Sequence, residues 1–118
     1  MPKPSGPQFD PINLLTEEGT NRSFKALYHG TTKNLEGVTE ISPEHSVKAG
    51  RNLSFATPSL SMARGFAGEE GYVYQVEPTD REDNDATWVR PMKHARKGSI
   101  EVVSNKGFNI LRQVHPKQ

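Results

Sequence analysis

Three clusters along the chain combine residue types that can form a small-molecule site. The first is the run Tyr28-His29-Gly30-Thr31, in which a histidine closes an apolar segment and a glycine follows it at once. A strand would fix the histidine ring, and the glycine backbone can approach a ligand closely because it carries no side chain. A histidine that ends a strand and bonds only to a loop carbonyl would give the same pattern. The run therefore indicates a polar site without defining one.

The other two clusters supply aromatic rings and a carboxylate. Phe55 and Phe66 lie eleven residues apart, the first at the end of a strand-like segment and the second on the helix expected after it. Two rings so placed can face each other across a cleft and hold a planar ligand, although core packing would use the same residues. Glu101 lies between Ile100 and Val102, so strand alternation puts its carboxylate on the face opposite to theirs. A strand glutamate most often simply faces water.

Short strands and one helix must position these residues. Strand-like segments cover residues 26–28, 52–56, 71–77, 88–89, 99–103 and 107–114. A helix is expected after Phe55, with Thr57 as its N-cap and Pro58 as its first residue. Many short strands with one helix predict an α+β fold. Residues 1–23 are rich in proline and polar residues and are expected to form a flexible N-terminal arm, with 24–118 forming a single domain.

Composition excludes several classes of protein. The absence of cysteine removes disulfide frameworks, thiolate nucleophiles and cysteine-based zinc sites. The remaining histidines, His45, His94 and His115, show no metal-ligand spacing, so no metal is expected. No apolar run is long enough to span a membrane or to act as a signal peptide, and no membrane partner is expected. Chemistry must come from carboxylates, histidines, hydroxyls or a bound cofactor.

Charge gives little support to nucleic-acid binding. The net charge is +1, whereas nucleic-acid-binding domains usually carry a clear basic excess. The basic run at residues 90–97 lies near Trp88 and could form such a patch. A run of this size is most often a solvated segment, and the acidic run at residues 79–86 precedes it directly. Nucleic acid is therefore not an expected partner.

Taken in order, the clusters resemble the ADP-ribosyltransferase superfamily, in the branch that includes diphtheria-type toxins, poly-ADP-ribose polymerases and the rifampin-inactivating ADP-ribosyltransferases. The segments that carry the resemblance are YHGT, LSFATPSLSMARGF, GYVYQVEPT and SIEVV, which together span roughly residues 26–104. GYVYQVEPT is particularly similar to a run in the rifampin-modifying subgroup. The resemblance implies a small ADP-ribosyltransferase-like α+β fold, with short, mainly antiparallel strands around an NAD cleft and few helices.

The resemblance also implies how each residue would contact NAD. His29 would hydrogen-bond the ribose of the adenosine half, the Gly30 backbone would hold the nicotinamide amide, and Thr31 would support that amide or a ribose. Phe55 and Phe66 would stack around the nicotinamide. The family usually has tyrosine at both aromatic positions, so stacking is kept here and the hydroxyl groups are lost.

An acidic residue would bond the nicotinamide ribose and stabilise the oxocarbenium-like transition state. A carboxylate beside a developing cation provides preorganised electrostatic stabilisation, which is usually a large term in catalysis. Toxin and polymerase members place a glutamate on a later strand, which is here Glu101. Rifampin-type enzymes place an aspartate in the loop after the VEPT strand, here the region of Glu82, Asp83 and Asp85. Glu101 and His29 are the expected catalytic residues, with Asp83 or Asp85 as the alternative acid.

The resemblance implies that NAD is a substrate whose ADP-ribose passes to a protein or small-molecule acceptor. With water as the acceptor, the reaction is NAD glycohydrolysis. Because Phe55 and Phe66 stand where the family usually has tyrosine, an alternative remains. The chain would then be a catalytically degenerate module that binds NAD or a protein partner. Members of the superfamily act in their own cytoplasm or as effectors delivered into other cells, and both locations are expectations for this chain.

Overall fold

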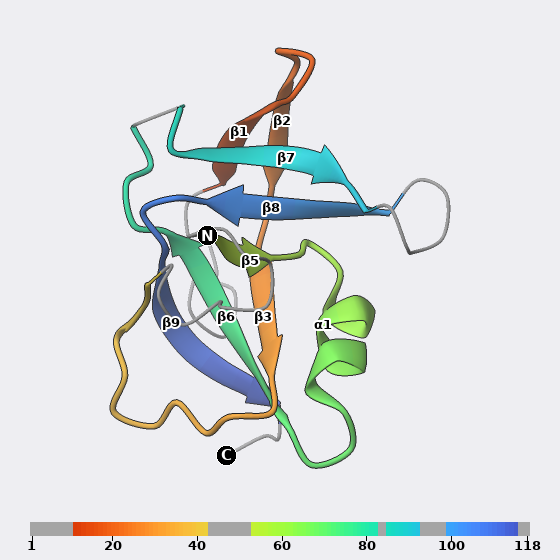
Figure 1. Ribbon diagram of the computed structural model, residues 1–118, viewed down its shortest axis with the longest axis vertical. Coiled ribbons are helices and arrows are strands. Elements are labelled where there is room, and N and C mark those ends of the chain that lie inside the picture. Colours follow the sequence, from red (N-terminus) through yellow and green to blue (C-terminus); the bar gives the residue numbers. More distant parts are fainter. Residues whose placement is uncertain (1–10, 43–52, 83–84, 93–98, 116–118) are drawn as a thin grey trace, which may run out of the picture.

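The computed structural model of the chain describes residues 11–42, 53–82, 85–92 and 99–115 (Figure 1). These residues form nine strands and one helix, which confirms the α+β class. In chain order the elements are β1 (Ile12–Thr16), β2 (Asn21–Phe24), β3 (Leu27–Thr31), β4 (Glu40–Ile41), β5 (Ser54–Ala56), α1 (Leu60–Ala67), β6 (Tyr72–Pro78), β7 (Thr87–Pro91), β8 (Ile100–Ser104) and β9 (Phe108–His115).

The strands form two sheets. The five-stranded sheet has the order β2-β1-β7-β8-β5, and the four-stranded sheet has the order β3-β6-β9-β4. Every pairing is antiparallel except that of β1 with β7, so the expectation of mainly antiparallel strands is confirmed. Figure 1 shows β7 and β8 of the five-stranded sheet running across the direction of β3, β6 and β9 of the four-stranded sheet, with α1 beside β3.

The hydrophobic core lies between the two sheets. Alternation along each strand turns one row of side chains inward. Leu27, Val76 and Phe108 of the four-stranded sheet pack in the same buried cluster as Val89 and Val102 of the five-stranded sheet. All five are at most 2% exposed. Side chains at the intervening positions of β8 and β5 therefore point away from this core.

The N-terminal segment differs from the mobile arm expected over residues 1–23. From residue 11 on, the chain forms the β1–β2 hairpin, and β1 also pairs with β7. Ile12 and Leu14 lie on either side of the exposed Asn13 and are each 4% exposed, so they contribute directly to the core. This burial outweighs the proline-rich composition on which the expectation of an arm rested. Residues 1–10 lie outside the described part of the chain.

Helix α1 begins two residues later than expected. The backbone N–H and C=O of Thr57 are both bonded to Tyr28, so Thr57 still behaves as a strand residue. Ser59 is the N-cap instead, and its Oγ accepts a hydrogen bond from the N–H of Met62 (3.2 Å). Pro58 precedes the cap rather than following it. No helix among the described residues has the length and apolar sequence needed to cross a membrane.

Candidate functional site

The edges of β3 and β5 meet at a single bridge between the two sheets. Tyr28 N–H donates to Thr57 O, and Thr57 N–H donates to Tyr28 O, each at 2.8 Å. The bridge is isolated, so the ladder does not continue from it along the two strands. Counting along these antiparallel segments from the bridge places Gly30 opposite Phe55. Gly30 and Phe55, which are both expected in the site, therefore lie opposite each other next to the bridge, where the two strands separate.

Gly30 presents polar backbone groups at the open edge of its sheet. Among the described residues, β3 is an edge strand of its sheet and pairs there with β6. Because Tyr28 directs its N–H and C=O away from β6, strand alternation directs those of Gly30 the same way. A Cβ at this position would lie 1.9 Å from the carbonyl oxygen of Ala63 on α1. Glycine is thus required here because the helix backbone packs directly on the strand.

His29 is fixed by a hydrogen bond to the β5 backbone. Its Nδ1 lies 2.7 Å from Phe55 O, and since a carbonyl oxygen only accepts, Nδ1 carries the proton. Burial lowers the pKa of His29 below 6.5, and the hydrogen bond to Phe55 O opposes this only in part. The ring is therefore neutral at pH 7, and its Nε2 is an acceptor.

Phe55, Arg90 and Glu101 form a cluster on the outer face of the five-stranded sheet. Their strands are neighbours in the order β7-β8-β5, and Arg90 is directly opposite Glu101. Ala56 and Val102 point to the core, so Phe55 and Glu101 share the other face. Arg90 Nε donates to Glu101 Oε1 at 2.7 Å, and the arginine Cζ lies 5.5 Å from the centroid of the Phe55 ring.

The arginine changes the chemistry of this cluster. The side chains of Arg90 and Glu101 are 24% and 19% exposed, so the ion pair is partly removed from water. The guanidinium compensates the carboxylate charge and covers one face of the Phe55 ring. Within the described chain, Oε2 of Glu101 has no hydrogen-bond partner. A ligand can therefore still reach one carboxylate oxygen, and a planar ring must displace Arg90 or use the other face of Phe55.

The other residues proposed to bind NAD are more exposed. Thr31 ends β3, and its Oγ1 accepts a hydrogen bond from Lys33 N–H (3.1 Å). Phe66 lies on α1 with 55% of its surface exposed. Within the described residues the stacked aromatic pair is Tyr72 with Tyr74, so Phe55 and Phe66 do not stack on each other. Phe66 is an unpaired ring on the helix that packs against β3.

The alternative acids are not brought to this cluster. Asp83 lies outside the described residues. Glu82 and Asp85 are exposed, and Asp85 lies in the turn before β7. Asp85 precedes Thr87, the first residue of β7, whereas Arg90 and its partner Glu101 lie near the other end of the β7–β8 pair.

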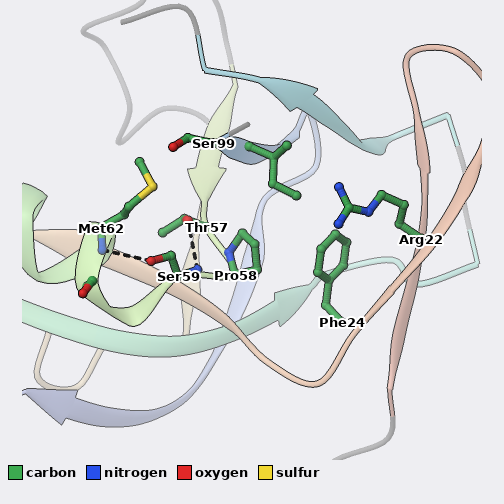
Figure 2. Close-up of a pocket in the computed structure, with 9 residues that line it drawn as sticks. Arg22, Phe24, Thr57, Pro58, Ser59, Met62 and Ser99 are labelled. Carbon is green, nitrogen blue, oxygen red and sulfur yellow. Dashed lines mark hydrogen bonds between the residues drawn. The ribbon is translucent and has the colours of Figure 1, made fainter. Parts of the chain in front are cut away.

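A hollow of about 690 Å³ lies beside the cluster rather than within it (Figure 2). Its walls come from β2, the turn between β5 and α1, the first turn of α1 and the start of β8. The lining residues are Arg22, Phe24, Thr57, Pro58, Ser59, Ser61, Met62, Ser99 and Ile100. None of the residues expected in the site from the sequence lines this hollow.

Sequence reasoning missed two arginines in particular. Arg90 belongs to the basic run at residues 90–97, for which the sequence indicates a solvated segment or a nucleic-acid patch. Its contact with Glu101 depends on the pairing of β7 with β8, whose residues are not adjacent in sequence. Arg22 fell within the expected arm.

The described residues contain no group of three or more histidine, aspartate or glutamate side chains that could hold a metal ion. No protein-family model, curated protein or solved structure matches this chain.

Proposed function

We propose that the chain binds NAD and breaks its nicotinamide–ribose bond, passing ADP-ribose to a protein or small-molecule acceptor or to water. The observation that carries this proposal is the shared face of Phe55 and Glu101, next to the open edge of β3 at Gly30. The Phe55 ring, the Glu101 carboxylate and the Gly30 backbone groups, which have no partner among the described residues, match the three parts of a nicotinamide riboside: its planar ring, its sugar and its amide.

Each chemical step has a group to support it. The Gly30 N–H and C=O can bond the carbonyl and the NH₂ of the nicotinamide amide, and Phe55 can stack on the ring. When the C–N bond breaks, its electron pair stays on the nicotinamide nitrogen and positive charge develops on the ribose. The Glu101 carboxylate stabilises that charge. An acceptor oxygen or nitrogen then bonds to the ribose carbon and releases any proton it carried.

His29 suits a role in binding rather than proton transfer. The hydrogen bond to Phe55 O sets the tautomer and fixes the ring, which leaves Nε2 to accept from a ribose hydroxyl. Its lowered pKa keeps the ring neutral and the acceptor available at pH 7. The order of the YHGT, FATP and SIEVV segments, similar to that of the ADP-ribosyltransferase superfamily, supports the same assignment. On this proposal the chain acts in its own cytoplasm or as an effector delivered into another cell.

A second function, NAD or protein binding without turnover, is favoured by one contact. Arg90 already neutralises Glu101 and covers a face of Phe55. If the guanidinium keeps this position when NAD is bound, the carboxylate stabilises a developing cation poorly. The two functions differ in a measurable way, because only the first releases nicotinamide.

The test is incubation with NAD and quantification of free nicotinamide, with calorimetry to measure NAD binding. Glu101→Gln keeps the shape of the side chain and removes its charge, so release should fall by on the order of a hundredfold. Glu77→Gln is the matched control, because Glu77 is also a strand glutamate paired with an arginine, through Arg81 Nε at 3.1 Å. Binding without release supports the second function, and no heat with NAD refutes both NAD-dependent functions.

A further inference from the structure

We propose that the hollow between β2 and the first turn of α1 binds a small anion joined to a planar apolar body, and that Arg22 binds the anionic group. This site is separate from the proposed NAD site. Ile100 lines the hollow, and its neighbour Glu101 points to the opposite face of β8 by strand alternation. The inference goes beyond the proposed function and does not depend on it.

The hollow is open to solvent and large enough to hold a small molecule. Its volume of about 690 Å³ falls within the range of roughly 300 to 1,000 Å³ typical of ligand pockets. Figure 2 shows Phe24 and Arg22 at one end and Met62 at the other, with Thr57, Pro58 and Ser59 between them. The apolar lining comes from Phe24, Pro58, Met62 and Ile100. An aromatic or other flat apolar group matches this surface.

The polar side chains around the hollow include several that can donate a hydrogen bond to a ligand. Ser59 Oγ accepts from Met62 N–H, and Thr57 Oγ1 accepts from Ser59 N–H (3.1 Å). Each hydroxyl keeps one proton to donate and a second lone pair. Ser59 can offer its proton to a ligand, whereas Thr57 is buried, with 2% of its surface exposed. Ser61 and Ser99 add two more hydroxyls. Among the described residues no carboxylate lines the hollow, so within this part of the chain no negative charge offsets the donors.

Arg22 supplies the positive charge. Its Cζ lies 5.5 Å from the centroid of the Phe24 ring, a cation–π contact that holds the guanidinium at the wall of the hollow. Arg22 is exposed and forms no ion pair with a described residue. A carboxylate or phosphate can therefore take both hydrogen bonds that a guanidinium offers in parallel. The ligand class that follows is an aryl or similar planar group bearing a carboxylate or phosphate.

The test uses four probes in NMR titrations of the full chain: phenyl phosphate, benzoate, inorganic phosphate and benzylamine. We expect phenyl phosphate or benzoate to bind and to shift the amide signals of Ser59, Ser61 and Ser99. The stronger of the two identifies the anionic group. Inorganic phosphate should bind at least tenfold more weakly because it lacks the apolar body, and benzylamine should not bind because it has the same ring with a positive charge.

Variants of Arg22 complete the test. Arg22→Gln should weaken binding of the preferred aryl anion at least tenfold, and Arg22→Glu should reverse the preference toward benzylamine. Arg64→Gln is the control, because Arg64 is an exposed arginine of α1 that does not line the hollow. Unchanged affinity in Arg22→Gln, equal binding of benzylamine, or equal binding of inorganic phosphate would each overturn the proposal. Glu101→Gln should leave this binding unchanged even where it abolishes nicotinamide release.

Discussion

Replacing Gly30 by alanine should destabilise the fold, whereas replacing Gly65 by alanine should stabilise it. A Cβ on Gly30 would lie 1.9 Å from the carbonyl oxygen of Ala63, and ordinary contacts begin at 3.4 Å, so α1 must move by roughly 1.5 Å. Overpacking of this kind costs about 1 to 3 kcal/mol of the free energy of unfolding, and the obstacle here is backbone that cannot rotate aside. The lower chain entropy of alanine offsets about 0.5 to 1 kcal/mol of that cost.

Gly65 provides the control within the helix that Gly30 contacts. A Cβ there would meet nothing within 4 Å, so alanine should add roughly 0.8 to 1 kcal/mol through helix propensity alone. Urea denaturation followed by circular dichroism and by Trp88 fluorescence measures both changes as shifts in midpoint at constant slope. Because α1 carries Phe66, Gly30→Ala should also weaken NAD binding. A Gly30→Ala protein as stable as the parent would refute the close packing of α1 on β3.

Two further predictions concern the residues on either side of the β3–β5 bridge. Since burial lowers the folded pKa of His29, the unfolded chain binds more protons below pH 6.5, and stability should fall as the pH drops from about 6.5 toward the folded pKa. His29→Gln should lose this part of the pH dependence in urea midpoints measured from pH 8 to pH 5, and an unchanged slope would contradict the assignment. Phe55→Ala should reduce NAD affinity or turnover far more than Phe55→Tyr, which keeps the ring. Equal loss of folding in both variants would show that Phe55 serves only the packing of the sheet.

Local sequence patterns predicted much of the architecture. The apolar runs around Leu27, Val73 and Val102 form strands because their side chains are buried: Leu27 and Val102 lie in the core between the sheets, and Val73 packs with Ala63 and Ala67 of α1. The helix was placed correctly to within two residues. Its cap moved to Ser59 because Thr57 is held by a partner strand far away in sequence. Tertiary pairing, which no local pattern encodes, decided that boundary.

The site was harder to predict than the fold. The opposition of Gly30 and Phe55 and the salt bridge of Glu101 both depend on strand register between distant segments. At the N-terminus, composition did not predict β1, in which Ile12 and Leu14, two residues apart, both contribute to the core. The residue types indicated which chemistry is available, whereas the distances between these residues could be known only from the structure.

The isolated bridge between Tyr28 and Thr57 has a mechanical consequence. Within the described chain it is the backbone-to-backbone link between β3 and β5, and the His29 ring adds one hydrogen bond beside it. The two sheets are therefore held together mainly by their shared core, and on the β5 side also by the hydrogen bond from Ser54 Oγ to Ile41 O. A ligand that bonds the Gly30 backbone and also contacts Phe55 would span both edges and add a further link between the sheets.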